Sequence, residues 1–166
     1  MTQPPFDLAA AHRWFAVEFN NAAWDLVERP ARTPDEDDAM LHAAHASVLH
    51  WQKVGTALHQ QRGEHLLAHV YMQLNQSAAA LAHATRCLQL SDGQLDAQTP
   101  FDRGTAFEAM ARAYACAGQD AEARRYRERA VEAGRLIPED DDRLAFDALL
   151  RGGNWFGLDP QCAQHD

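Results

Sequence analysis

The chain has 166 residues, 46% of them hydrophobic, and a formal net charge of −9. This length is typical of one domain, here residues 1–166, that buries roughly 70% of the surface of its unfolded chain. The negative charge argues against nucleic acid as a partner, because contacts with phosphate groups require a concentrated basic surface.

Composition also predicts the fold class and the compartment. Alanine-rich stretches, few β-branched residues and no long alternating pattern indicate an all-α protein. No apolar run approaches the roughly 20 residues that span a bilayer, and the polar, proline-containing start of the chain is unlike a signal peptide. We interpret Cys87, Cys116 and Cys162, which form no C-x-x-C motif, as reduced thiols. The sequence therefore predicts a cytoplasmic protein that does not engage a membrane.

The first predicted helix runs from Asp7, a suitable N-cap, to Arg29, which is followed by a proline. Its apolar residues form two stripes at helical spacing, so we expect the helix to be covered on two sides. The cover is either two neighbouring helices or one helix and a second subunit. One stripe contains Leu8, Phe15, Phe19, Ala22 and Leu26, and the other contains Trp14, Val17, Asn21 and Trp24.

Six further helices follow in the chain. Thr33-Pro34 with Glu36 forms a capping box and opens the second helix, which is predicted to extend to Ala57. The third and fourth helices are predicted over 62–75 and 78–90, with Ser77 as a cap. Thr99-Pro100 opens the fifth, and Asp120 caps the sixth. The seventh lies between residues 138 and 151, and residues 154–158 form a short aromatic tail.

The pattern of residues 62–90 returns at residues 105–133, an offset of 43 residues. The correspondence aligns Leu67-Ala68 with Met110-Ala111, and also the pairs Tyr71 and Tyr114, Ala80 and Ala123, and Cys87 and Ala130. These two segments resemble tetratricopeptide (TPR) repeats, which are helical hairpins. The resemblance implies antiparallel hairpins stacked as a short superhelix of about seven helices, with a C-terminal helix and tail at 138–166. The whole chain, including its stretch from Ala44 to Trp51, also resembles uncharacterised bacterial repeat-containing proteins.

Histidine is the unusual residue of this chain, with seven of the nine histidines between His42 and His83. His42 and His45 are three residues apart, and His65 and His69 are four apart on the next helix. An i, i+4 pair can bind a transition metal together with a third ligand such as Glu64 or His45. The alternative is that these are polar residues of a helix surface or groove. We expect no cofactor, and we keep His42, His45, His65 and His69 as the candidates for a metal site.

The chain has no recognisable catalytic motif. G-x-S-x-G and H-E-x-x-H are both absent, and no cysteine lies in an activating context. No glycine-rich loop precedes a helix in the order that binds phosphate. The sequence therefore predicts a protein that is not an enzyme.

One face of the third predicted helix is polar. The resemblance implies that the first helix of each repeat lines a concave, ligand-binding surface. Carried to the second copy, the positions of this face are Thr105, Glu108, Arg112, Ala115 and Cys116. The candidate partner-binding residues are Arg62, His65, His69, Met72, Gln73, Glu108 and Arg112.

The resulting hypothesis is a cytoplasmic scaffold or regulatory component that binds a protein or peptide in a polar-to-cationic groove. We expect the guanidinium groups of Arg62 and Arg112 to face solvent and to bind an acidic segment or a terminal carboxylate. The alternative is a His-ligated metal-binding helical bundle, including a metal-dependent enzyme. A homodimer is also predicted, through the stripe containing Trp14 and Val17 or through the Trp155-Phe156 tail.

Overall fold

Seven α-helices form the part of the chain that the computed structural model describes, residues 5–93 and 98–158. They are α1 (Leu8–Val27), α2 (Pro34–Val54), α3 (Ala57–Gln73), α4 (Ser77–Asp92), α5 (Pro100–Cys116), α6 (Asp120–Gly134) and α7 (Asp140–Arg151). The predicted all-α class and the seven helices are confirmed. The ends of the chain, with Cys162, and part of the predicted loop after α4 lie outside the described residues.

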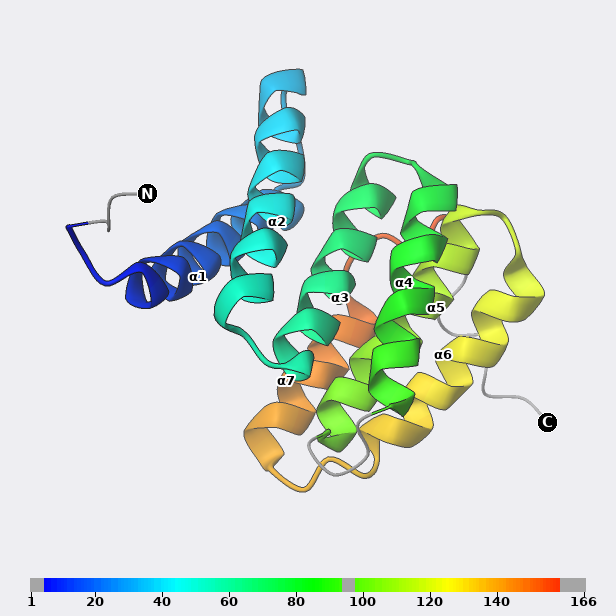
Figure 1. Ribbon diagram of the computed structural model, residues 1–166. Helices are drawn as coiled ribbons and strands as arrows, with labels where there is room; N and C mark the ends of the chain where they lie inside the picture. Colours follow the sequence, from blue (N-terminus) through cyan, green and yellow to red (C-terminus); the bar gives the residue numbers. More distant parts are fainter. Residues whose placement is uncertain (1–4, 94–97, 159–166) are drawn as a thin grey trace.

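The helices pack in pairs that follow the order of the chain. The largest interfaces join α1 to α2, α3 to α4, and α5 to α6 (Figure 1). Each hairpin also contacts the next one, and α7 packs against α5 and α6. Within the described residues, no helix combines the length and hydropathy that crossing a membrane requires.

Side-chain hydrogen bonds cap the starts of α1, α2 and α5. The predicted capping box at the start of α2 is confirmed, since Glu36 N donates to Thr33 Oγ1 (3.3 Å) and Thr33 N donates to Glu36 Oε2 (2.8 Å). However, α3 begins at Ala57 rather than at Arg62. Thr56 N donates to Nδ1 of His59 (3.1 Å) and so starts the helix five residues earlier than predicted. The N-caps of α4 and α6 are Gln76 and Gln119, each one residue before the position that we predicted.

The two predicted repeats have the same backbone geometry where their hairpins turn. Asn75 and Gly118, 43 residues apart, adopt left-handed conformations with φ of 55° and 69°. Gln76 N donates to Tyr71 O, and Gln119 N donates to Tyr114 O, both at 2.9 Å. These are the hydrogen bonds of a Schellman motif at the end of a helix. The α3–α4 and α5–α6 hairpins therefore repeat with the offset that the sequence predicted.

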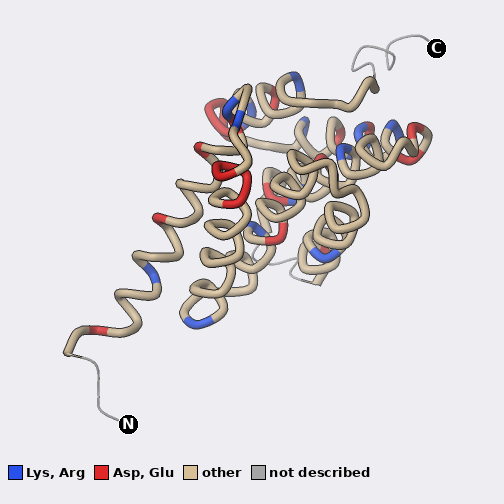
Figure 2. Tube along the Cα trace, turned by 90° about the horizontal axis from the view of Figure 1, so that it is seen from above, with Lys and Arg blue, Asp and Glu red and all other residues tan. Residues whose placement is uncertain are grey.

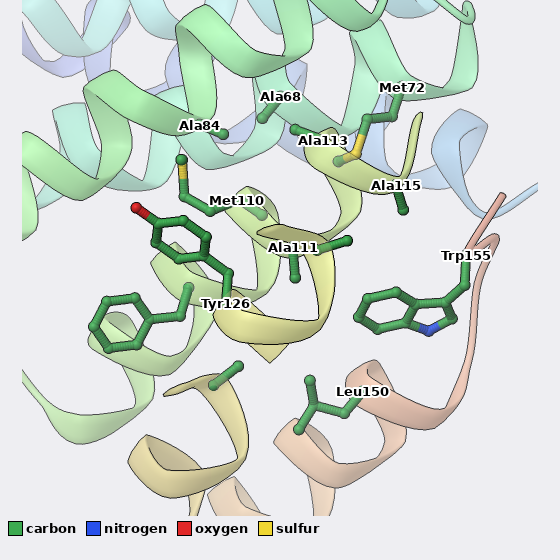
Figure 3. Close-up of a cluster of buried hydrophobic side chains, with 14 of the residues drawn as sticks. Ala68, Met72, Ala84, Met110, Ala111, Ala113, Ala115, Tyr126, Leu150 and Trp155 are labelled. Atoms are coloured by element: carbon green, nitrogen blue, oxygen red, sulfur yellow. The ribbon is translucent and has the colours of Figure 1, made fainter. Parts of the chain in front are cut away.

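The interior contains two apolar clusters. The smaller joins α1, α2 and α3, and the larger joins α3 through α7 with the residues after α7. Figure 3 shows part of the larger cluster, where Trp155 lies near Leu150 and Ala115. Trp155 is buried and Phe156 is partly buried. The tail therefore lacks the exposed aromatic surface on which its prediction as a subunit interface depended, because the segment after α7 folds back into the core.

Helix α1 differs from the prediction in the stripe that it buries. Its buried residues are Ala16, Ala23 and Val27, which pack small side chains against the neighbouring helices. Trp14, Phe15 and Val17 are exposed, so aromatic residues from both predicted stripes face outward. The pattern identified the apolar residues, but it could not identify which of them a neighbour covers.

Candidate functional site

A cavity of about 1140 Å³ is bounded by the C-terminal end of α1 and by α3, α5 and α7. Six of the seven predicted partner-binding residues line it: Arg62, His65, His69, Met72, Gln73 and Arg112. The seventh, Glu108, is fully buried, and its carboxylate is hydrogen-bonded to side chains that line the cavity. The structure thus brings the predicted residues together around one cavity, and their role in binding stays a prediction.

The polar centre of this cavity is built from corresponding positions of the two repeats. His65 and Glu108 are 43 residues apart, and so are His69 and Arg112. Nε2 of His65 lies 3.3 Å from Oε2 of Glu108, and Nε2 of His69 lies 3.0 Å from the same oxygen. Helices α3 and α5 are the first helices of the two hairpins, and they pack against each other. Corresponding faces of the two helices therefore contribute side chains to the same polar centre.

Arg112 does not face solvent, contrary to the prediction. Its side chain is buried, and its Nε donates to Oε1 of Glu108. Its terminal nitrogens donate to the backbone carbonyl oxygens of Asn154 (2.9 Å), Leu149 (2.6 Å) and Gly152 (2.8 Å). The guanidinium also lies 4.1 Å from the ring centroid of Trp155. Arg112 therefore satisfies carbonyl groups that the end of α7 leaves without helical partners.

The charge state of this cluster follows from its burial and its partners. Burial raises the pKa of Glu108, but the charges of His69 and Arg112 and the hydrogen bonds from both histidines together hold it well below its ordinary value. Burial lowers the pKa of His69 and outweighs the attraction of Glu108. Glu108 is therefore a carboxylate at neutral pH and is paired with the guanidinium of Arg112.

Arg62 is a cation of the cavity that remains accessible. Its side chain is 58% exposed, and Nε and Nη2 both lie 2.9 Å from Oδ1 of Asp102. Asp102 is buried and also accepts hydrogen bonds at the capped start of α5. Nη1 of Arg62 has no hydrogen-bond partner in residues 5–93 and 98–158. This guanidinium is held in place while part of its hydrogen-bonding capacity is still available.

The lining is less cationic than the sequence indicated. Each of its three arginines pairs with a carboxylate: Arg29 with Glu36, Arg62 with Asp102, and Arg112 with Glu108. Figure 2 shows basic and acidic residues interspersed along the chain rather than separated into two halves. The expected cationic character is thus limited to the exposed parts of Arg29 and Arg62.

The four metal candidates separate into two groups. His42 is exposed, and Nε2 of His45 lies 2.9 Å from the hydroxyl of Tyr71. Neither joins His65 and His69, whose shared acidic neighbour is Glu108. Glu64, which we considered as a third ligand, instead lies 2.7 Å from Nδ1 of His83. Spacing within one helix could not identify Glu108 as a third ligand for His65 and His69, because Glu108 lies in the other repeat.

Trp24 of α1 packs against the two histidines of the cluster. Its ring centroid lies 5.6 Å from that of His65 and 5.3 Å from that of His69. Trp24 also lines the cavity. The second stripe of α1 therefore contributes this aromatic residue to the site, whereas Trp14 and Val17 of the same stripe stay exposed.

Comparisons with models of known protein families, with curated proteins and with solved structures gave no match. Residues 5–93 and 98–158 therefore form an all-helical structure whose seven helices pack in sequence, with two equivalent hairpins and a cavity lined by both.

Proposed function

We propose that the protein is a TPR-like scaffold or regulatory component of the cytoplasm that binds an acidic peptide segment in the cavity. The repeated turns at Asn75 and Gly118 support the comparison with tandem helical hairpins. The first helices of these hairpins, α3 and α5, supply the polar wall of the cavity, as concave surfaces of such repeats do. The proposed function is binding, and it includes no reaction.

The observation that carries this proposal is the half-exposed guanidinium of Arg62. Arginine donates to a carboxylate through two parallel N–H groups, and such charge-assisted hydrogen bonds are stronger than neutral ones. Asp102 fixes the orientation of Arg62 and leaves Nη1 available. A carboxylate of a partner, from an acidic side chain or a chain terminus, fits this unused donor.

The rest of the cavity suits the neighbouring residues of a peptide. Trp24, Met72, Phe101 and Phe156 provide apolar surface, while Gln73 and other polar side chains provide donors and acceptors. Binding sites commonly combine apolar walls with a few polar groups that fix the orientation of the ligand. We therefore expect affinity from an apolar residue adjacent to the acidic group.

Selection from a displayed random-peptide library tests the proposal, followed by fluorescence anisotropy with the peptides that are recovered. We expect enrichment of peptides with an acidic group beside an apolar residue. Their affinity should decrease as salt is added, because the carboxylate and Arg62 are partly in solvent. Replacing Asp or Glu by the amide, or amidating the C-terminus, distinguishes a side-chain carboxylate from a terminal one.

Arg62→Gln should weaken binding of these peptides at least tenfold, with an unchanged circular dichroism spectrum. Arg103→Gln is the matched control, because Arg103 also pairs with a carboxylate (Asp92, 3.2 Å) but does not line the cavity. Enrichment of no peptide, or equal affinities for the wild type and Arg62→Gln, would show that the cavity does not bind acidic segments in this way.

A further inference from the structure

Three side chains of the kinds that bind metal ions lie close together at the cavity. They belong to His65, His69 and Glu108, and their ligand atoms lie within 4.8 Å of one another. Within the described part of the chain, no other three histidine, cysteine or acidic side chains come together closely enough to bind a metal ion. Two of these separations, 3.3 Å and 3.0 Å, join Oε2 of Glu108 to the two Nε2 atoms. Bonds of about 2.0–2.1 Å to a tetrahedral ion place neighbouring ligand atoms roughly 3.3 Å apart. The cluster therefore has nearly the spacing that a shared ion requires.

The surrounding contacts orient the three side chains. Arg112 binds Oε1 of Glu108 and leaves Oε2 directed at the histidines. The ring of Trp24 packs against both imidazoles. Contacts of this kind hold metal ligands in position and are a regular part of metal sites.

We propose that His65, His69 and Glu108 bind a divalent transition-metal ion, with zinc as the ion that best suits two imidazoles and one carboxylate. Three protein ligands leave the fourth position of a tetrahedral ion open to water or to another molecule. Because His65 and His69 line the cavity, this open position is reached from the cavity. The inference is independent of the proposed function, since it requires neither Arg62 nor a peptide.

Other histidines of the chain are competitors for an added metal. The Nδ1 atoms of His12 and His50 are 2.8 Å apart, and His45 lies near His83 with ring centroids 6.2 Å apart. Neither pair belongs to a group of three ligands among residues 5–93 and 98–158. These pairs provide controls that distinguish a site with three ligands from adventitious binding by two histidines.

The test uses the full chain without an affinity tag after treatment with a chelator. Calorimetric titration with Zn²⁺ should show saturable binding of one ion per chain, and zinc should raise the Tm. Co²⁺ should give the visible absorption bands of a four-coordinate ion. His65→Gln and His69→Gln should each weaken zinc binding by more than the roughly 10- to 100-fold that loss of an outer partner costs.

His50→Gln, His45→Gln and Arg62→Gln should retain zinc binding, with folding of every variant verified by circular dichroism. The absence of saturable zinc binding by the wild type would overturn the proposal regardless of the variants. It would also be overturned if His50→Gln or His45→Gln abolished binding while His65→Gln or His69→Gln preserved it. Because Arg62→Gln removes the proposed peptide contact alone, failure of one proposal is distinguishable from failure of the other.

Discussion

Arg112 and Glu108 form a buried ion pair across one turn of α5, and Arg112 also binds the backbone at the end of α7. Breaking a buried pair from one side leaves an uncompensated charge, which costs about 3–5 kcal/mol. We therefore expect Arg112→Met to lower the free energy of unfolding by this amount, measured by urea denaturation. Arg125→Met is the control, because its pair with Glu122 is exposed and contributes about 0–1 kcal/mol. Equal losses for the two variants would contradict the anchoring role of Arg112.

Phe146 of α7 fills the space that two glycines leave on α5 and α6. A Cβ atom on Gly104 would lie 2.7 Å from the Phe146 ring, and one on Gly134 would lie 2.6 Å from it. Overpacking costs about 1–3 kcal/mol, whereas replacing a helical glycine by alanine gains about 1 kcal/mol. We expect Gly104→Ala to be destabilising by up to about 2 kcal/mol.

The same substitution should become stabilising in a Phe146→Leu background, where the ring no longer blocks the added methyl group. A double-mutant cycle, with the four free energies of unfolding measured under the same conditions, reports this coupling. A loss of stability from Gly104→Ala that is the same in both backgrounds would mean that Phe146 is not its cause.

The alanines shared by the two hairpins permit close helix packing. Ala80 and Ala123 are both fully buried at corresponding positions of α4 and α6. We expect Ala80→Leu and Ala123→Leu each to reduce the free energy of unfolding by about 1–3 kcal/mol. Ala82→Leu, at an exposed position of α4, should be nearly neutral. Thermal stability equal to that of the wild type in both buried variants would be inconsistent with the packing of these hairpins.

The features that the sequence predicted well depend on interactions between nearby residues. Thr33 and Glu36 form their capping box within one turn, and Thr99 with Asp102 repeats this arrangement at α5. Helical periodicity is also local, so it placed Arg62, His65 and His69 around one cavity. The 43-residue offset between the repeats also predicted Glu108 as a member of this site, because corresponding positions meet when equivalent hairpins stack.

The features that the sequence did not predict depend on contacts between distant segments. Apart from Glu108, the hydrogen-bond partners of Arg112 are backbone carbonyl groups at and after the end of α7, and a carbonyl group has no signature in the residue types. Burial of Trp155 depends on how the chain turns after α7. Exposure of Trp14 likewise depends on which helices reach α1, and periodicity alone does not determine this.

Cys87 should be unreactive in the folded protein. Burial raises the pKa of its thiol to about 12, so almost no thiolate is present at pH 8. In a variant with Cys116→Ser and Cys162→Ser, we expect DTNB to modify Cys87 only through unfolding, at a rate that rises with urea. The matched variant that retains Cys116, which is partly buried, should react faster without urea. Equally fast modification of both thiols in the absence of urea would contradict this protection.

The exposed aromatic surface of α1 supports the prediction of a homodimer. The Trp14 side chain lies on the same helix face as Val17, with residue exposures of 58% and 40%, and Leu8 and Leu49 are exposed as well. Burying such side chains against a second copy would remove apolar area from water, at roughly 25 cal/mol per Å² before the costs of association. We expect sedimentation velocity to show a dimer whose fraction increases with protein concentration.

Val17→Glu should shift this equilibrium to the monomer, because a carboxylate at the centre of an apolar interface loses its hydration without gaining a partner. Leu136→Glu provides the control, since Leu136 is 71% exposed and follows α6, outside the α1–α2 hairpin. Dimerisation that is lost equally in both variants would place the interface elsewhere. A wild-type protein that sediments as a monomer at all concentrations would show that the exposed face of α1 does not join two copies of the chain.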